Sequence, residues 1–329
     1  MNIGLIGYGG VGKAFIRLLE EKHIHCSIKY ILKSDGGVFN SKGLDINDVI
    51  KIEDNIKEHE EWMEGRNFEN VIDEKIDFLV ELTPTNMKTG EPALTYIKEA
   101  LNRGINVVTG NKGPILINYL GLKELAKKNN VSLGIGCTTG GALPSITGGR
   151  VDCAGARIEE IQGVLNGTTN YILKEMGTKE IEYEEALKNA QELGIAETNP
   201  KMDVEGFDTA IKMIILTNAL LGKKLTLEDA EIEGITKVTV KDIKEAEQEG
   251  KKIKLLGKVF TKKGNIKVKV TPVSIDEEHP LYFVEGKNKG IYYRTDTLGD
   301  ITIIGGASST RNAAAAILRD IENIKIMRV

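Results

Sequence analysis

The stretch NIGLIGYGGVGKAFIRLLE, residues 2–20, decides the fold of this chain. The apolar run Asn2–Ile6 predicts a buried strand, and the apolar spacing within Lys13–Lys22 predicts a helix. Between them stands Gly7-x-Gly9-x-x-Gly12, where the first glycine permits a tight turn and the second lets the backbone approach a pyrophosphate. The third glycine lets the helix pack on the strand. Because the motif joins a strand to a helix, it predicts a dinucleotide site better than it predicts a plain glycine turn.

The segments that follow extend this unit into a sheet. Ser27–Leu32 is a second strand candidate, and Asp77–Leu82 and Asn106–Thr109 have the composition of buried parallel strands. Ala93–Arg103 has helical periodicity between them. Residues 36–76 are polar and acidic, and we predict peripheral helices and loops there. Strands that alternate with helices indicate an α/β fold with a Rossmann-type, doubly wound parallel sheet.

The length of 329 residues predicts two domains. The composition changes near residue 134, where Gly134–Gly149 is rich in Gly, Ser and Thr and suggests a hinge. We predict a dinucleotide-binding domain at residues 1–133, completed by a C-terminal helix within 305–329, and an α+β substrate-binding and dimerisation domain at residues 134–304. For the second part of the chain, the patterns predict a strand at 158–165, helices at 169–176, 183–193 and 204–221, β-type alternation over 251–294, and a final helix at 312–324.

Composition excludes several classes of partner and site. The net charge of −4 gives no reason to expect nucleic acid, and no apolar run approaches a membrane span. The start of the chain leads directly into the first strand and does not resemble a signal peptide. Three scattered cysteines and four histidines form no metal-ligand pattern, which favours a reducing, cytoplasmic location. We therefore expect a small-molecule substrate, without nucleic acid or membrane as a partner.

The residues after the second strand bear on the choice of coenzyme. The strand ends Leu32-Lys33-Ser34-Asp35, so a cation and a hydroxyl precede the acidic residue. Lys33 and Ser34 could meet a 2′-phosphate, which favours NADP, whereas Asp35 could bind the ribose hydroxyls of NAD. An exposed loop lysine is an equally open interpretation of Lys33. The residues that we expect at the coenzyme are Gly7, Gly9, Gly10, Val11, Gly12, Lys33, Ser34, Thr83 and Lys112.

An acid–lysine constellation carries the candidate chemistry. Asp208 and Lys212 are four residues apart and so share a helix face, while Glu197 and Asp203 precede them. An ordinary surface ion pair would have the same spacing. However, apolar residues at Phe207 and in the stretch Ile211–Ile214 surround the pair, and a partly buried lysine beside a carboxylate is suited to donate a proton.

Two further motifs end strands. Lys112 follows the strand at 106–109 within TGNKGP, where a side chain at the carboxyl end of a parallel strand points toward the coenzyme crevice. The segment GVLNGTTN, residues 163–170, leads from a strand into a helix. Its amides and hydroxyls could hold a small polar substrate, or they could form a simple helix cap.

Together these motifs resemble the homoserine dehydrogenase family over nearly the full chain. The matching segments are GYGGVG, ELTPTN, VVTGNKGP, GVLNGTTNYIL, GIAETNPKMDVEGFDTAIK, HPL and AAAAILRDI. The resemblance implies a reversible, NAD(P)-dependent hydride transfer between L-homoserine and L-aspartate 4-semialdehyde, in threonine and methionine biosynthesis. It implies a monofunctional enzyme without kinase or regulatory domain, and a homodimer formed through the sheet of the second domain.

The resemblance also implies roles for individual residues. Lys212 would be the acid–base group, Asp208 would orient the substrate or the lysine, and Lys112 would lie between nicotinamide and substrate. Glu197 would bind the substrate amino group, and Asp203 would support the polar cluster. Gly167 and Thr168 would lie near the substrate. A monovalent cation, Na⁺ or K⁺, would bind the backbone of Thr139, Gly141 and Leu143.

The chain departs from the family pattern in several places. Ile195 stands where the family usually has Tyr, Asn199 where it has Asp, and the glutamate before the cation loop is absent. These departures leave two other functions open: a related dehydrogenase of another small amino or 2-oxo acid, and a non-catalytic NAD(P)-binding sensor. An acylating semialdehyde dehydrogenase fits less well, because Cys137 has no evident histidine partner in the sequence.

Overall fold

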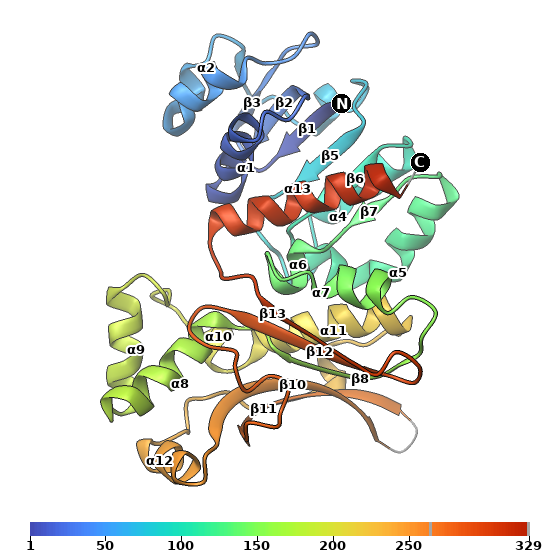
Figure 1. Ribbon diagram of the computed structural model, residues 1–329. Helices are drawn as coiled ribbons and strands as arrows, with labels where there is room; N and C mark the ends of the chain where they lie inside the picture. The colour runs from blue at the N-terminus through green and yellow to red at the C-terminus, as the bar shows by residue number, and fades with distance from the viewer. Residues whose placement is uncertain (263–264, 328–329) are drawn as a thin grey trace. The chain divides into compact units, whose positions relative to one another are not determined.

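The computed structural model describes residues 1–262 and 265–327 (Figure 1). The chain forms two units. The first contains Met1–Gly141 together with the C-terminal segment from Ser309, and the second is Ala142–Ser308. The functional domain boundaries that the sequence suggests, after residues 133 and 304, stay predictions.

A seven-stranded sheet organises the first unit, in the order β4-β3-β2-β1-β5-β6-β7. The five strands from β2 to β7 in this order are parallel, which confirms the Rossmann-type fold. Helices α1 and α13 pack on each other, whereas α4 packs on α5 and on β5 and β6 (Figure 1). The elements are β1 Asn2–Ile6, α1 Gly10–Glu21, β2 Ser27–Lys33, β5 Phe78–Glu81, α4 Ala93–Asn102, β6 Asn106–Thr109, α5 Lys112–Lys128, β7 Leu133–Gly134 and α13 Thr310–Ile326.

The region 36–76 is not made only of helices and loops, so that part of the prediction was wrong. Two antiparallel edge strands, β3 (Gly36–Phe39) and β4 (Trp62–Glu64), extend the sheet beside β2. β3 is four residues long and begins with two glycines, and β4 is three residues long, so both are too short to show a strand period. Short helical segments accompany them: α2 Ile46–Lys51, the 3₁₀ helix η1 Glu53–Glu58 and α3 Phe68–Val71.

The C-terminal helix completes the first unit. Ile317 and Ile321 of α13 are fully buried in the same hydrophobic core as Phe15 of α1. The carboxylate of Asp320, also on α13, accepts a hydrogen bond of 2.6 Å from the amide of Gly136. The end of the chain is thereby tied to the turn after β7.

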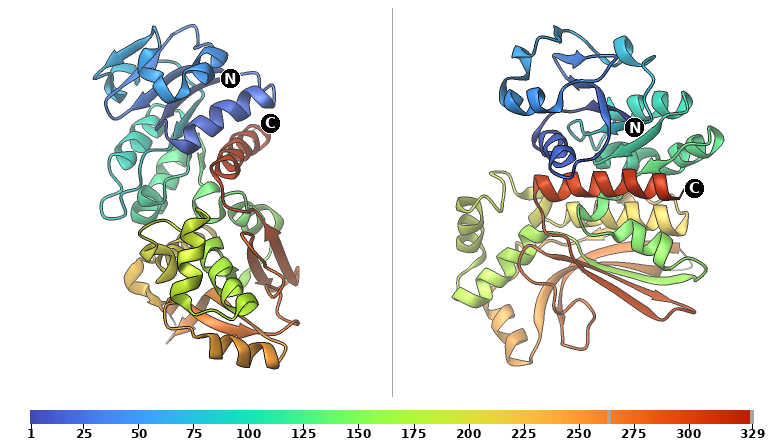
Figure 2. Two further views of the ribbon diagram at one scale, coloured as in Figure 1. Left: turned by 90° about the vertical axis from the view of Figure 1, so that its left-hand side faces the viewer. Right: turned by 45° about the horizontal axis from the view of Figure 1, so that its top comes forward.

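The second unit contains a six-stranded mixed sheet in the order β13-β12-β8-β10-β11-β9. Helices α8, α11 and α12 pack against strands of this sheet (Figure 2). The elements are β8 Ile158–Val164, α8 Gly167–Lys179, α9 Tyr183–Glu192, α10 Lys201–Val204, α11 Phe207–Leu221, the 3₁₀ helix η3 Leu227–Asp229, β9 Ala230–Ile232, α12 Val240–Gln248, β10 Lys252–Lys262, β11 Asn265–Ile275, β12 Lys289–Thr295 and β13 Asp300–Gly305.

Two predicted segments differ in the structure. The helix expected at 204–221 begins at Phe207, as α11, because Gly206 adopts a left-handed conformation with φ of 86°; Val204 instead ends the short helix α10. The segment 134–149, which we expected to be a hinge, contains two short helices, α6 (Cys137–Gly140) and α7 (Ser145–Thr147). The π-helical turn η2 (Gly148–Asp152) follows them. Among the described residues, no helix combines the length and the hydrophobicity that crossing a membrane would need.

Candidate active site

The glycine turn between β1 and α1 has the geometry of a dinucleotide site. Gly7 has φ of 96°, and a Cβ there would lie 2.3 Å from the carbonyl oxygen of Leu82. A Cβ on Gly12 would lie 2.4 Å from the carbonyl oxygen of Gly7, so both positions require glycine. A Cβ on Gly9 would meet nothing within 4 Å. No described side chain caps the start of α1, so its first amides can bind a phosphate.

A buried carboxylate organises the carboxyl ends of β5 and β6. Glu81 is fully buried and accepts hydrogen bonds from the Thr83 amide at 2.8 Å, the Thr83 hydroxyl at 2.5 Å and the Thr109 hydroxyl at 2.7 Å. Burial raises its pKa, and the hydrogen bonds from Thr83 and Thr109 oppose that rise. Asn111 joins the group, because its side chain donates to the carbonyl oxygen of Thr83 at 3.1 Å. Sequence reasoning identified Thr83 but missed the glutamate that holds it.

The residues expected to select the coenzyme lie at the end of β2 and in the turn to β3. Lys33 is partly exposed and Ser34 is exposed, as a residue that meets a ligand must be. Asp35 pairs with Lys57 at 2.7 Å, and this hydrogen bond lowers the pKa of the aspartate. Lys57 thus contacts one of the two carboxylate oxygens of Asp35, the Oδ2 atom.

The acid–lysine pair on α11 is buried. Lys212 donates to the Oδ2 atom of Asp208 at 2.5 Å, and the two side chains are 12% and 9% exposed. Lys212 also donates to the carbonyl oxygen of Leu165, at the end of β8, at 2.9 Å. These two bonds use two of the three N–H donors of an ammonium group. The pair is therefore not the surface ion pair that the spacing alone would allow.

Asn166 connects this pair to Asp203. Its side-chain nitrogen donates to Asp203 at 2.6 Å and to Asp208 at 3.0 Å. Its side-chain oxygen accepts from the amide of Thr169 at 2.9 Å and so caps α8. The structure shows the helix cap that the sequence offered as one interpretation, and the binding of a substrate by this segment stays a prediction. We refer to Asn166, Asp203, Asp208 and Lys212 as the acid–lysine cluster.

The other predicted substrate residues lie at the start of α8 and in the loop before α10. Gly167 is the first residue of α8, and a Cβ there would lie 3.0 Å from the carbonyl oxygen of Lys287. The hydroxyl of Thr168 donates to the carbonyl oxygen of Ile195 at 3.1 Å. Glu197, two residues further on, is exposed, and its backbone carbonyl accepts from Gln191. The structure thus brings Asp203, Asp208 and Lys212 together but does not bring the Glu197 carboxylate into the cluster.

The remaining predicted site residues are Lys112 and the three residues of the expected cation site. Lys112 is the first residue of α5, directly after its cap, Asn111. Of the carbonyls proposed for a monovalent cation, that of Gly141 accepts from Arg319 at 3.5 Å and that of Leu143 from the Ser145 amide at 2.8 Å. Thr139 is buried within α6. Within residues 1–262 and 265–327, no group of three or more His, Cys, Asp or Glu side chains could hold a metal ion.

Comparisons with known proteins identify the family. The family model for homoserine dehydrogenase matches residues 144–321. The homoserine dehydrogenase of Methanocaldococcus jannaschii is 37% identical, with 98% of each chain covered. The chain belongs to the homoserine dehydrogenase family. It is an NAD(P)-dependent oxidoreductase.

Solved structures of the family have the same fold. A structure from Archaeoglobus fulgidus, provisionally assigned as a homoserine dehydrogenase, has a TM-score of 0.87 at 32% identity and covers 98% of this chain and 99% of its own. A hyperthermophilic archaeal homoserine dehydrogenase in complex with NADPH has a TM-score of 0.84 at 27% identity, covering 99% of this chain and 98% of its own. An NAD(+)-dependent homoserine dehydrogenase from Pseudomonas canavaninivorans is 32% identical, covering 98% of this chain and 96% of its own. The family therefore includes proteins described with either coenzyme.

Proposed function

We propose that this chain catalyses the reversible oxidation of L-homoserine to L-aspartate 4-semialdehyde, with the acid–lysine cluster as its catalytic centre. The observation that carries the proposal is the buried Lys212, held by Asp208 and by the carbonyl oxygen of Leu165. Two carboxylates and one ammonium group leave the cluster with a formal charge of −1. A net negative cluster favours a substrate with a cationic amino group, as homoserine has.

In this mechanism each residue of the cluster has a distinct task. Bound at the glycine turn, NAD(P) supplies the hydride acceptor. In reduction the Lys212 ammonium group donates a proton to the carbonyl oxygen of the semialdehyde, and in oxidation the neutral Lys212 amine takes the proton of the substrate hydroxyl. Asp208 and the carbonyl of Leu165 fix the position of the ammonium group, and Asn166 fixes both aspartates. Glu197 as a ligand of the substrate amino group stays a prediction, as does Lys112 between nicotinamide and substrate.

The substitution Lys212→Ala tests this proposal. We expect kcat for homoserine oxidation to fall by about 10²–10⁴-fold, the usual range for loss of an acid–base group. Coenzyme binding, measured by quenching of the single tryptophan or by calorimetry, is expected to stay unchanged. Near-normal turnover would remove Lys212 from its role. If the unmodified chain reduced neither NADP nor NAD with homoserine at any pH, the function itself would be refuted.

NADP is the coenzyme that the turn after β2 favours. Lys33 and Ser34 offer a cation and a hydroxyl to a 2′-phosphate, and Lys57 matches the charge of Asp35. Steady-state rates with NADP and NAD decide the preference. Lys33→Gln should raise the KM for NADP and leave the KM for NAD unchanged. An equal effect on both coenzymes would make Lys33 an ordinary loop lysine.

Three other properties belong to the proposal. We expect a homodimer in the cytoplasm, which sedimentation and cell fractionation test. A monovalent cation at the backbone of Thr139, Gly141 and Leu143 predicts that replacing K⁺ or Na⁺ by tetramethylammonium lowers the rate. The alternative function, a related dehydrogenase of another small amino acid or 2-oxo acid, is suggested by Ile195 in place of tyrosine, and the comparisons do not favour it. A panel of such substrates distinguishes the two functions.

A further inference from the structure

A buried lysine lies outside the acid–lysine cluster. Lys254 of β10 is only 3% exposed, and its ammonium group donates to the carbonyl oxygen of Val284 at 2.6 Å and to the side-chain oxygen of Asn170 at 3.0 Å. A buried ammonium group is costly unless its hydrogen bonds are satisfied. Its placement therefore points to a function that an apolar residue would not perform.

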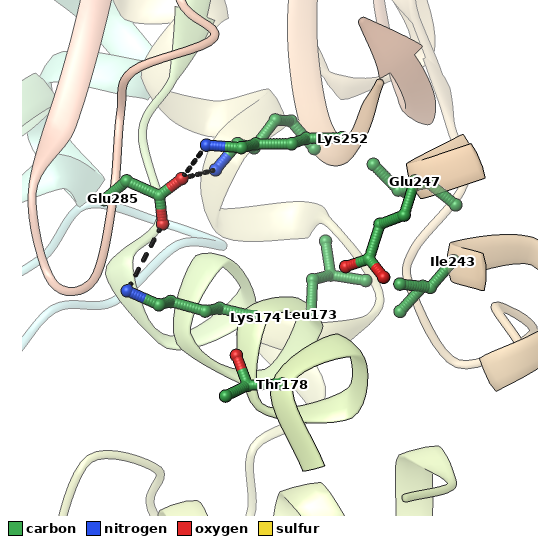
Figure 3. Close-up of a pocket in the computed structure, with 9 residues that line it drawn as sticks. Leu173, Lys174, Thr178, Ile243, Glu247, Lys252 and Glu285 are labelled. Carbon is green, nitrogen blue, oxygen red and sulfur yellow. Dashed lines mark hydrogen bonds and ion pairs between the residues drawn. The ribbon is translucent and has the colours of Figure 1, made fainter. Parts of the chain in front are cut away.

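The surroundings of Lys254 form a charged pocket of about 320 Å³ (Figure 3). One carboxylate, that of Glu285, lies 2.6 Å from Lys252, 3.5 Å from Lys174 and 3.7 Å from Lys254. Burial lowers the pKa of Lys254 to about 8, and the attraction of Glu285 opposes that change. Lys252 is half-buried, shares the same carboxylate and lies over the ring of Tyr282. The bond to Asn170 distinguishes Lys254 from its neighbours.

Asn170 fastens the first turn of α8 to the loop before β12. Its side-chain nitrogen donates to the carbonyl oxygen of Gly286 at 2.9 Å and to that of Val284 at 3.3 Å. The backbone amide of Asn170 donates to the carbonyl oxygen of Asn166 at 3.3 Å. Gly167 packs against the backbone of Lys287 in the same loop. The turn that carries Asn166, Gly167 and Thr168 is thus held against the loop through Asn170.

We propose that Lys254 is a positioning residue of the enzyme, which acts through Asn170 to fix the first turn of α8 and with it the substrate end of the acid–lysine cluster. Lys254 joins strand β10, the loop at Val284 and helix α8 through one ammonium group. Removal of that group leaves the Asn170 oxygen without its buried donor, and the Val284 carbonyl keeps only the 3.3 Å bond from the Asn170 side-chain nitrogen. The turn then loses one of its attachments while Lys212, on α11, keeps its own bonds. The inference rests on the proposed homoserine dehydrogenase activity.

The test compares Lys254→Met with Lys252→Met. The first variant keeps the aliphatic length but loses the donor. The second removes an ammonium group from the same strand and the same carboxylate without touching Asn170. For Lys254→Met we expect kcat/KM for homoserine to fall about tenfold or more, with the coenzyme KM within about twofold of wild type. Lys252→Met should retain wild-type kinetics within about twofold.

A double-variant cycle shows whether the effect passes through Asn170. The combination of Lys254→Met with Asn170→Leu should be no worse than about twofold below the poorer single variant, because both break one connection. Independent, multiplying effects would overturn the proposal, as would a Lys254→Met enzyme that is less stable but kinetically normal. If Lys254→Met does not fold, Asn170→Ser must show the same selective loss toward homoserine. A wild-type chain inactive on homoserine would instead refute the activity itself.

Discussion

Asn166 has two roles in the structure, and two substitutions can test them separately. Its oxygen caps α8, and its nitrogen bridges Asp203 and Asp208. Asn166→Ser keeps a good helix cap but removes the bridge, because serine ranks with asparagine at this position. Asn166→Ala removes both. The difference between the two variants therefore isolates the cap, and the difference between wild type and Asn166→Ser isolates the bridge.

The structure sets the expected magnitudes. The bridge consists of two hydrogen bonds to carboxylates, at 2.6 Å and 3.0 Å. Hydrogen bonds to charged groups contribute about 1.5–3 kcal/mol each, and partial access of water to Asp203 reduces the sum, so we expect a loss of about 3 kcal/mol for Asn166→Ser. The alanine variant should lose about 1 kcal/mol more through the cap. Displacement of the aspartates should also lower kcat/KM for homoserine by about 10²-fold.

Urea denaturation and steady-state kinetics on the same preparations check both numbers. A serine variant within about 0.5 kcal/mol of wild type would refute the bridge as a stabilising contact, since surface substitutions have effects of that size. A destabilised serine variant with normal kcat/KM would show that the bridge supports the fold and not the reaction. Equal stability of the serine and alanine variants would contradict the assignment of the cap.

Three other predictions follow from the geometry. Gly9→Ala should fold normally but raise the KM for the coenzyme. Gly7→Ala should raise that KM and also lower the free energy of unfolding, because the φ of 96° at Gly7 and the nearby Leu82 carbonyl exclude a Cβ. Equal stability of the two variants would contradict this prediction. Glu81→Gln should lower the free energy of unfolding by about 1–3 kcal/mol, since three donors meet the buried carboxylate, and urea denaturation measures it. The pKa of Lys254 is lowered by burial from 10.5 to about 8 in the folded chain, so the unfolded chain holds more protons between those values. The stability of wild type relative to Lys254→Met should therefore rise between about pH 8 and about pH 10.5, and a flat difference would contradict the assignment.

The parallel part of the first sheet could be predicted from the sequence because its signals are local. Apolar strands beside a glycine turn and an amphipathic helix carry their period within a few residues, and β1 and β6 have the predicted bounds. The edge strands β3 and β4 could not be predicted in the same way. β4 pairs with a strand that is distant in the chain, and neither β3 nor β4 is long enough to show alternation of apolar and polar residues.

The candidate site also has contacts that the sequence predicts and contacts that it does not. The spacing of Asp208 and Lys212 predicts a shared helix face, and the structure has them in contact. The bonds of Asn166 to the two aspartates and of Lys254 to Asn170 depend on tertiary folding, because they join residues 37 to 84 positions apart in the chain. Lys254 in particular alternates with apolar residues on an ordinary strand, where a lysine is most often solvent-exposed.

The position of Asp203 shows why the break between α10 and α11 matters to the chemistry. On one continuous helix, residues five apart point about 140° away from each other around the axis, so Asp203 and Asp208 could not both reach one side-chain amide. Gly206 interrupts the helix with its φ of 86°, and the two carboxylates then converge on the nitrogen of Asn166. The helix predicted for 204–221 begins one residue after Asp203, so its period does not show this convergence. The glycine in VEGFD is therefore part of what assembles the acid–lysine cluster, although it carries no reactive group of its own.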